Sequence, residues 1–224
     1  MRTRLLLLAA FVTLFTLAAG ATVIDHFSAP PGGQKVCVPG VVGCSTTSTM
    51  TGLSDVLGGT RVMTISEVNG NSATAEANGS SPAQQSLLVL DNSFSSHATL
   101  TIDWTNVSGL NLIPNNETLL ALSYGSDGHT FDITFVLNGY SVSRTGLSTP
   151  GTPDVLLIPL WEFTPNWETE FASMTSASMT ITTSPGADVF VDLIQSSVPE
   201  PLTFAMMGMG LVAIGAFRIR RRGE

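Results

Sequence analysis

The feature that most restricts the fold is an alternation of apolar and polar residues along the middle of the chain. The stretches 98–104 (ATLTIDW) and 130–137 (TFDITFVL) place an apolar side chain at every second position. A period of two puts one face of a β-strand in the core and the other in water. We expect further strands at 61–68, 72–78, 86–91, 117–124, 139–144, 155–160, 173–183 and 187–195.

Turn-forming pairs with glycine separate these segments. Asn138-Gly139 stands between two alternating runs and predicts a two-residue hairpin turn. Short strands separated by glycine-containing turns predict an all-β fold, a two-sheet antiparallel β-sandwich, with jelly-roll topology as our first choice. The segment before Arg61 is rich in Gly, Pro, Ser and Thr. We expect it to cross the sandwich edge with little regular structure.

The first residues of the chain have the layout of an export signal. Arg2 and Arg4 precede an apolar run from Leu5 to Ala18, and Ala19-Gly20-Ala21 supplies small residues for cleavage. We therefore expect a signal peptide, in helical form, over residues 1–21, removed after Ala21.

The last residues form a second unusual segment over 198–224. Val198-Pro199-Glu200-Pro201 is followed by an apolar run, 202–217, and by Arg218, Arg220, Arg221 and Arg222. As a helix the run would be roughly 24 Å long, short of the ~20 residues of an ordinary spanning helix. Arginines beside such a helix stay on the cytoplasmic side. We expect a transmembrane helix at 202–217 that holds an exported domain, residues 22–197, outside the inner membrane.

Residues 22–198 are strongly acidic. Their only basic residues are Lys35, Arg61 and Arg144, against fifteen acidic ones, which gives a formal charge of −12. A body with this charge repels nucleic acid and anionic lipid surfaces, so we expect neither as a partner. Cys37 and Cys44, the two cysteines, predict a disulfide in an exported chain. A zinc site is the alternative, but two cysteines alone lack the remaining ligands.

The sequence offers no complete catalytic constellation. It has no Gly-x-Ser-x-Gly segment, and His26, His97 and His129 are scattered. We therefore predict no enzyme activity, no cofactor and no metal. The stretch 161–170 (WEFTPNWETE) offers Trp161 and Trp167 as a platform for stacking on a sugar. We favour a second interpretation, in which Trp161 and Phe163 continue the preceding strand into the core while the acidic residues face water.

The tail, taken with the signal peptide, resembles the PEP-CTERM sorting signal of Gram-negative bacteria. The resemblance rests on Val198 to Pro201, on the apolar run with its glycines, and on the closing arginines. It implies that the tail is recognised at Pro-Glu-Pro by exosortase, a membrane-embedded processing enzyme of bacteria that often make exopolysaccharide. The body would then be sorted to the cell surface or extracellular matrix, in a structural or adhesive role. A carbohydrate-binding module and a protein kept by a single-pass anchor are the alternatives.

The body resembles a recurrent ectodomain type among such proteins. The resemblance rests on VIDHFSAP at 23–30, on a Gly-Gly-x-Arg strand at 58–61, and on GADVFVDLIQ at 186–195. It implies no activity. Because Arg61 is one of three basic residues in an acidic body, we expect it to pair with a carboxylate rather than bind a ligand.

Overall fold

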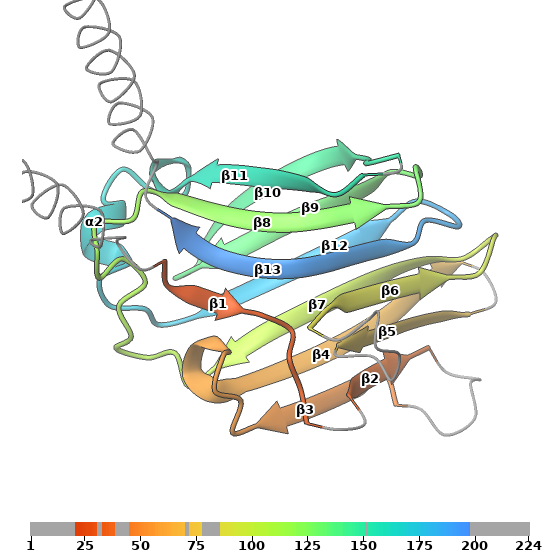
Figure 1. Ribbon diagram of the computed structural model, residues 1–224, viewed down its shortest axis with the longest axis horizontal. Helices are drawn as coiled ribbons and strands as arrows, with labels where there is room; N and C mark the ends of the chain where they lie inside the picture. Colours follow the sequence, from red (N-terminus) through yellow and green to blue (C-terminus); the bar gives the residue numbers. More distant parts are fainter. Residues whose placement is uncertain are drawn as a thin grey trace, which may run out of the picture.

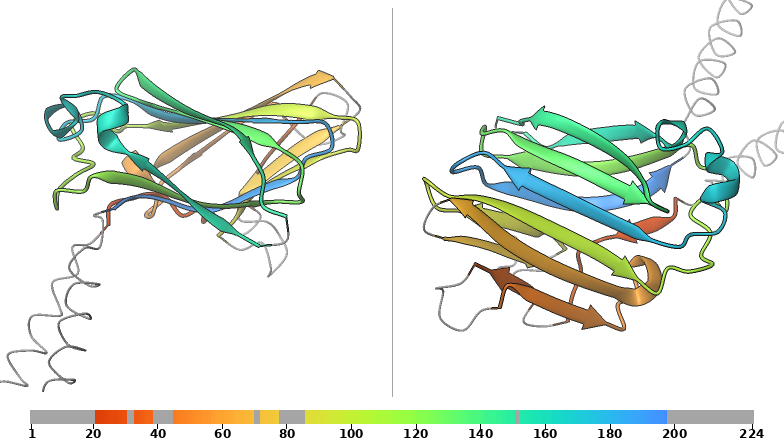
Figure 2. Two further views of the ribbon diagram at one scale, coloured as in Figure 1. Left: turned by 90° about the horizontal axis from the view of Figure 1, so that it is seen from above. Right: turned by 180° about the vertical axis from the view of Figure 1, so that it is seen from behind.

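Two antiparallel sheets stack face to face in the computed structural model (Figures 1 and 2). The structure describes residues 21–30, 33–38, 45–69, 72–77, 86–150 and 152–197. The expected signal helix and the transmembrane helix at 202–217 lie outside these ranges. Within them, every helix is too short or too polar to cross a bilayer.

The first sheet has seven strands, in the order β11-β8-β13-β6-β5-β2, with β1 paired to β13. The second has six, in the order β10-β9-β12-β7-β4-β3. The first sheet consists of β1 (Val23–Asp25), β2 (Gln34–Cys37), β5 (Ala73–Ala77), β6 (Leu88–Asn92), β8 (Leu119–Ser126), β11 (Asp154–Pro159) and β13 (Val189–Ser197). The second consists of β3 (Thr47–Thr51), β4 (Thr60–Asn69), β7 (His97–Thr105), β9 (Phe131–Leu137), β10 (Tyr140–Leu147) and β12 (Ala177–Thr183). Three short helical turns complete the described fold: η1 (Leu57–Gly59), η3 (Leu160–Glu162) and α2 (Trp167–Glu170).

The order of β6 to β13 is that of a jelly roll. Of these eight strands, β6, β13, β8 and β11 are neighbours, in that order, in one sheet. The other sheet holds β7, β12, β9 and β10 in that order. This is the interleaving of two Greek keys that defines the topology. The strands β2 to β5 widen both sheets at one side.

The alternating runs form strands at the predicted places. In β9, Phe131, Ile133, Phe135 and Leu137 are buried while Asp132 is exposed, so the period of two describes one buried face. The predicted hairpin is confirmed: Leu137 pairs with Tyr140 across a two-residue turn. Asn138 and Gly139 have φ angles of 52° and 82° there, the left-handed region that Asn-Gly tolerates.

The expectation for the segment before Arg61 was wrong. It carries β1, β2, β3 and the turn η1, which complete the edges of both sheets. These strands have three to five residues, too few for an alternation to stand out. They form because their backbone groups pair with β13, β5 and β4, and because Ile24 and Val36 are fully buried.

Arg61 is fully buried and pairs with Asp25. The expectation that Arg61 pairs with a carboxylate is confirmed. Its Nη1 donates to Asp25 Oδ1 at 2.7 Å, and its Nε donates to Gln34 Oε1 at 2.8 Å. Asp25 also accepts from the Trp104 indole at 2.8 Å and from the backbone of Phe27 at 2.7 Å. Burial raises the pKa of Asp25, and the Arg61 charge and these hydrogen bonds oppose the rise. The Arg61–Asp25 ion pair thus joins 23–30 and 58–61, two of the segments on which the resemblance to the ectodomain type rests.

Gly58 in the Gly-Gly-x-Arg segment has no room for a side chain. Its φ is +72°, and a Cβ would lie 2.2 Å from the carbonyl oxygen of Thr105 at the end of β7. Gly58→Ala should therefore add overpacking of about 1–3 kcal/mol to the backbone strain of about 1–2 kcal/mol. Gly52 has nearly the same φ, +73°, with nothing within 4 Å, so Gly52→Ala isolates the strain. Urea unfolding should show the larger loss for Gly58→Ala, and equal losses would contradict the contact.

Candidate functional site

The described fold ends at Ser197, directly before the tail. Ser197 is the last residue of β13, an internal strand of the seven-stranded sheet. Its carbonyl accepts a hydrogen bond from the backbone of Thr118 at 3.0 Å, and it pairs with Leu119 on β8. The tail sequence begins at the next residue, so no linker separates it from the sheet.

The start of the described chain lies at the same place. The backbone of Ser196 donates to the Thr22 carbonyl at 2.8 Å, and the backbone of Thr22 donates to Ser196 Oγ at 3.3 Å. The Thr22 hydroxyl donates to the fully buried carboxylate of Glu117 at 3.3 Å. We name Thr22, Thr118, Ser196 and Ser197 the tail root. Both ends of the sandwich therefore leave from one end of the molecule, the end that carries α2 (Figures 1 and 2).

Trp161 flanks the tail root. Thr118 donates to Ser197 and accepts, through its carbonyl, from the backbone of Leu160 at 2.9 Å. The next residue, Trp161, lies on η3 and is 62% exposed. The prediction that it would continue the strand into the core was wrong, because β11 ends at Pro159 and the chain turns into η3. Phe163 does enter the core, where its ring packs edge-on against that of Phe171 with the ring centroids 5.8 Å apart.

Trp167 behaves differently from Trp161. It lies at the start of α2 and is partly buried, with its ring packed against the core. Of the two candidate sugar-stacking residues, Trp161 therefore presents much the more open ring. The carboxylate beside it, Glu162, is paired: Arg144 Nη2 on β10 donates to Glu162 Oε2 at 2.6 Å.

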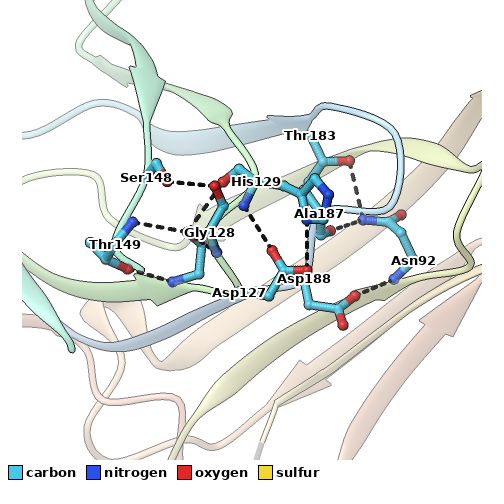
Figure 3. Close-up of polar contacts among 10 residues, drawn as sticks. Asn92, Asp127, Gly128, His129, Ser148, Thr149, Thr183, Ala187 and Asp188 are labelled. Atoms are coloured by element: carbon cyan, nitrogen blue, oxygen red, sulfur yellow. Dashed lines mark hydrogen bonds and ion pairs between the residues drawn. The ribbon is translucent and has the colours of Figure 1, made fainter. Parts of the chain in front are cut away.

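The opposite end of the sandwich holds a polar network built by the end of β6 and by the β8–β9, β10–β11 and β12–β13 connections (Figure 3). Asn92 donates from its side chain to Thr183 Oγ1 at 3.2 Å and to the Ala187 carbonyl. Its backbone donates to Asp188 Oδ1 at 2.9 Å. Burial raises the pKa of Asp188, and the nearby carboxylate of Asp127 adds to the rise. These bonds fix the β12–β13 connection against the end of β6.

Asp127 and His129 form a hydrogen-bonded pair in this network. Among the described residues, neither nearby serine hydroxyl donates to the His129 ring as a nucleophile would. His129 Nδ1 lies 2.9 Å from Asp127 Oδ2. Burial alone would raise the pKa of Asp127, but the hydrogen bonds from His129 outweigh it and leave the pKa below its usual value. The serine hydroxyls nearby donate to main chain, Ser126 to the His129 carbonyl and Ser148 to the Gly128 carbonyl. Within the described ranges, no three His, Cys, Asp or Glu side chains are grouped to hold a metal.

The outer face of the six-stranded sheet carries a row of hydroxyls. The register places Thr47, Thr64, Thr101, Thr180, Thr134 and Ser143 side by side across all six strands. Neighbouring hydroxyls are 2.8 Å apart for Thr134 and Ser143 and 3.4 Å apart for Thr101 and Thr180. In the sequence these residues occupy the polar positions of the alternating pattern. That pattern predicted that they face solvent, but it could not predict that they align across the strands.

A shallow hollow lies on the same face, near the end of β7. Its volume is ≈ 620 Å³, and Val62, Asp103, Asn106 and Ser178 are among the residues that line it. Burial raises the pKa of Asp103 there. Of the described residues that line the hollow, Asp103 alone is charged. The described lining therefore offers one carboxyl group beside hydroxyls, one side-chain amide and apolar side chains, without a second acid for glycoside hydrolysis.

Most other predicted site residues lie outside the described ranges. Ala19, Val198 to Pro201 and the four closing arginines are among them. Ala21 is the first described residue and is exposed. Cys37 ends β2, is buried and is disulfide-bonded. Cys44 is not described, so the pairing of these two cysteines stays a prediction.

Comparison with known proteins decides what the tail is. A family model described as the PEP-CTERM protein-sorting motif matches residues 197–222. The chain carries a PEP-CTERM sorting motif. The match includes the predicted Pro-Glu-Pro, the apolar run and the arginines, and it begins at Ser197, where β13 ends. The resemblance that the sequence suggested is therefore confirmed. Among curated proteins, none matches the chain.

Several solved structures match part of the chain at low identity. An agarase matches with a TM-score of 0.40 and 12% identity over 60% of this chain, and the chain spans only 24% of the agarase. A family 11 carbohydrate-binding module from Clostridium thermocellum, in complex with a β-1,3-1,4-mixed-linked tetrasaccharide, matches at 0.32 and 10% identity. That match covers 75% of this chain and 98% of the module. A family 29 carbohydrate-binding module matches at 0.36 and 10%, over 70% and 97%. Likenesses at this level say nothing about what this chain binds.

Proposed function

We propose that the protein is exported, held briefly in the inner membrane by its tail, processed by an exosortase-type enzyme, and sorted to the cell surface or extracellular matrix. There the sandwich acts as a structural or adhesive component. The observation that carries the proposal is that the sorting motif begins at Ser197, the last residue of β13. In this proposal residues 1–21 are the signal peptide, 22–197 the exported domain and 198–224 the sorting signal.

The tail has the parts that this role needs. In this proposal the prolines at 199 and 201 would keep the backbone extended, because each ring fixes φ and disfavours helix in the residue before it. Extended backbone offers free donors and acceptors to a processing enzyme. The apolar run 202–217 would hold this segment at the membrane, and the arginines after it would orient the run. The proposal assigns no catalysis, cofactor or metal to the body.

The proposal is tested by following the protein in cells that make the exosortase-type enzyme and in cells that lack it. With the enzyme, the body should be recovered from the surface or matrix fraction. Without it, the same amount of protein should accumulate in the membrane fraction with its tail intact. Equal distribution in both strains would favour the alternative, a protein retained by a single-pass anchor.

Carbohydrate binding is the second candidate, and the exposure of the Trp161 ring favours it. An aromatic face in water can stack on a sugar ring. Exopolysaccharide would be the natural target at the surface. On a glycan array, Trp161→Ala should abolish binding, whereas Trp167→Ala should reduce it less because Trp167 is partly buried. An array on which the intact protein binds no glycan would eliminate this candidate.

A further inference from the structure

We propose that the end of the sandwich around the tail root rests on the lipid–water interface while the tail is in the membrane, with the Trp161 ring inserted among the headgroups. The partner is a zwitterionic bilayer surface. This inference rests on the proposed function, because it requires the apolar run to lie in the bilayer. It assigns to the body a membrane contact that the tail sequence alone does not imply.

The short tether forces the body close to the membrane. Four residues, 198–201, separate Ser197 from the apolar run that begins at Leu202. Fully extended chain covers at most about 3.6 Å per residue, so the Cα atoms of Ser197 and Leu202 can be no more than about 18 Å apart. The headgroup layer on one side of a bilayer takes up roughly 5–7 Å of that distance. Ser197 therefore lies within about 11–13 Å of the headgroups, little more than the ~10 Å that separates two stacked sheets.

The sheet cannot easily lengthen this tether. The end of β13 is held by Thr118 at Ser197 and by Thr22 at Ser196, with N···O distances of 3.0 Å and 2.8 Å. Freeing these residues would expose backbone groups of an internal strand and detach the start of the body as well. The distance limit therefore applies to the folded protein.

Trp161 is the side chain that this geometry brings to the interface. Thr118 links the two segments: its N–H donates to the Ser197 carbonyl, and its carbonyl accepts from Leu160, the residue before Trp161. Trp161 is 62% exposed, although a large aromatic side chain gains free energy by burial. Tryptophan concentrates at the membrane–water interface, because its ring is apolar and its N–H bonds to headgroups. Leu157, on the edge strand β11 that leads to η3, is a further exposed apolar side chain, at 51%.

Charge decides which lipid surface fits. The carboxylate next to Trp161 is neutralised, because Glu162 pairs with Arg144. Glu117, which accepts from Thr22 of the tail root, is fully buried. Glu168 and Glu170 on α2 remain, and residues 22–198 carry a formal charge of −12. An anionic surface would repel them, so the contact suits zwitterionic lipid.

The chain contains a matched control at its other end. Phe94, in the connection between β6 and β7, is 93% exposed. It lies at the end of the sandwich away from α2 and the tail root (Figure 1). A contact driven by any exposed aromatic ring would involve Phe94 as much as Trp161. A contact set by the tether involves Trp161 and leaves Phe94 in water.

The test uses the full chain reconstituted through its tail into phosphatidylcholine vesicles that contain a headgroup-level quencher lipid. Trp104 is 2% exposed and Trp167 is packed against the core, so lipid-dependent quenching of tryptophan emission reports mainly Trp161. We expect quenching in the intact protein, its near-complete loss in Trp161→Ala, and no change in Phe94→Ala. Addition of anionic lipid should weaken the quenching. Urea unfolding of each variant verifies that the exposed substitutions leave the fold intact.

Flotation of the vesicles separates the two levels of the proposal. If the chain does not float with lipid, the tail does not enter the bilayer and the proposed function fails. If it floats but Trp161 is not quenched, or Phe94→Ala has the same effect as Trp161→Ala, the interfacial contact is overturned while the sorting role stands. If Trp161 emission responds to a soluble polysaccharide and not to lipid, Trp161 belongs to a sugar site and the contact is likewise overturned.

Discussion

Arg61→Met is expected to lower the free energy of unfolding by about 3–5 kcal/mol, the usual cost of removing one partner from a buried ion pair. The guanidinium is fully buried and donates to Asp25, Gln34 and the Ser28 carbonyl. Without it, the Asp25 carboxylate keeps only the Trp104 indole and the Phe27 amide. Because burial already raises the pKa of Asp25, the carboxylate must then stay charged without a counterion or take up a proton.

The chain offers a matched control for this prediction. Arg144 also forms an ion pair, with Glu162 at 2.6 Å, but the two side chains are 29% and 27% exposed. Arg144→Met should cost at most about 1 kcal/mol, as partly solvated pairs do. Urea unfolding followed by tryptophan emission measures both, since Trp104 bonds directly to Asp25. An Arg61→Met loss no larger than that of Arg144→Met would contradict the structural role of the buried pair.

Replacing Pro199 and Pro201 together by alanine is expected to block processing and to shift the protein from the surface fraction to the membrane fraction. Alanine restores a backbone N–H and allows helix, so the apolar helix could extend back toward Ser197. The extended segment available to the enzyme would then be lost. Fractionation of cells followed by detection of the body measures the shift.

Pro185 supplies the control for the proline variant. It lies in the connection between β12 and β13, at the end of the sandwich away from the tail root. Pro185→Ala should leave the distribution between fractions unchanged. Normal surface delivery of the Pro199 and Pro201 double variant would show that the extended segment is not what the processing enzyme requires.

The sequence predicted the strands well where one face of a long strand is buried. Strands such as β7 and β9 alternate over seven or more residues, so local pattern and burial agree. The same reasoning missed β1 and β2, which have three and four residues. Those strands depend on pairing with β13 and β5, residues distant along the chain. Non-local pairing of this kind leaves no periodic signal.

The candidate sites were predictable to different degrees. The sorting motif is local, so its residues could be found from the sequence. That Arg61 would meet a carboxylate followed from the scarcity of basic residues, but its partner, Asp25, is 36 residues away and could not be named. The exposure of Trp161 could not be predicted, because it continues the apolar stretch of β11 and leaves the core only where the chain turns into η3.

The intact mass of the protein recovered from the cell surface or medium tests the sorting account most directly. The account predicts a chain that begins at Thr22, after removal of residues 1–21, and lacks Leu202 to Glu224. A surface-recovered protein whose mass includes Leu202 to Glu224 would contradict it, and would leave the tail as a permanent anchor.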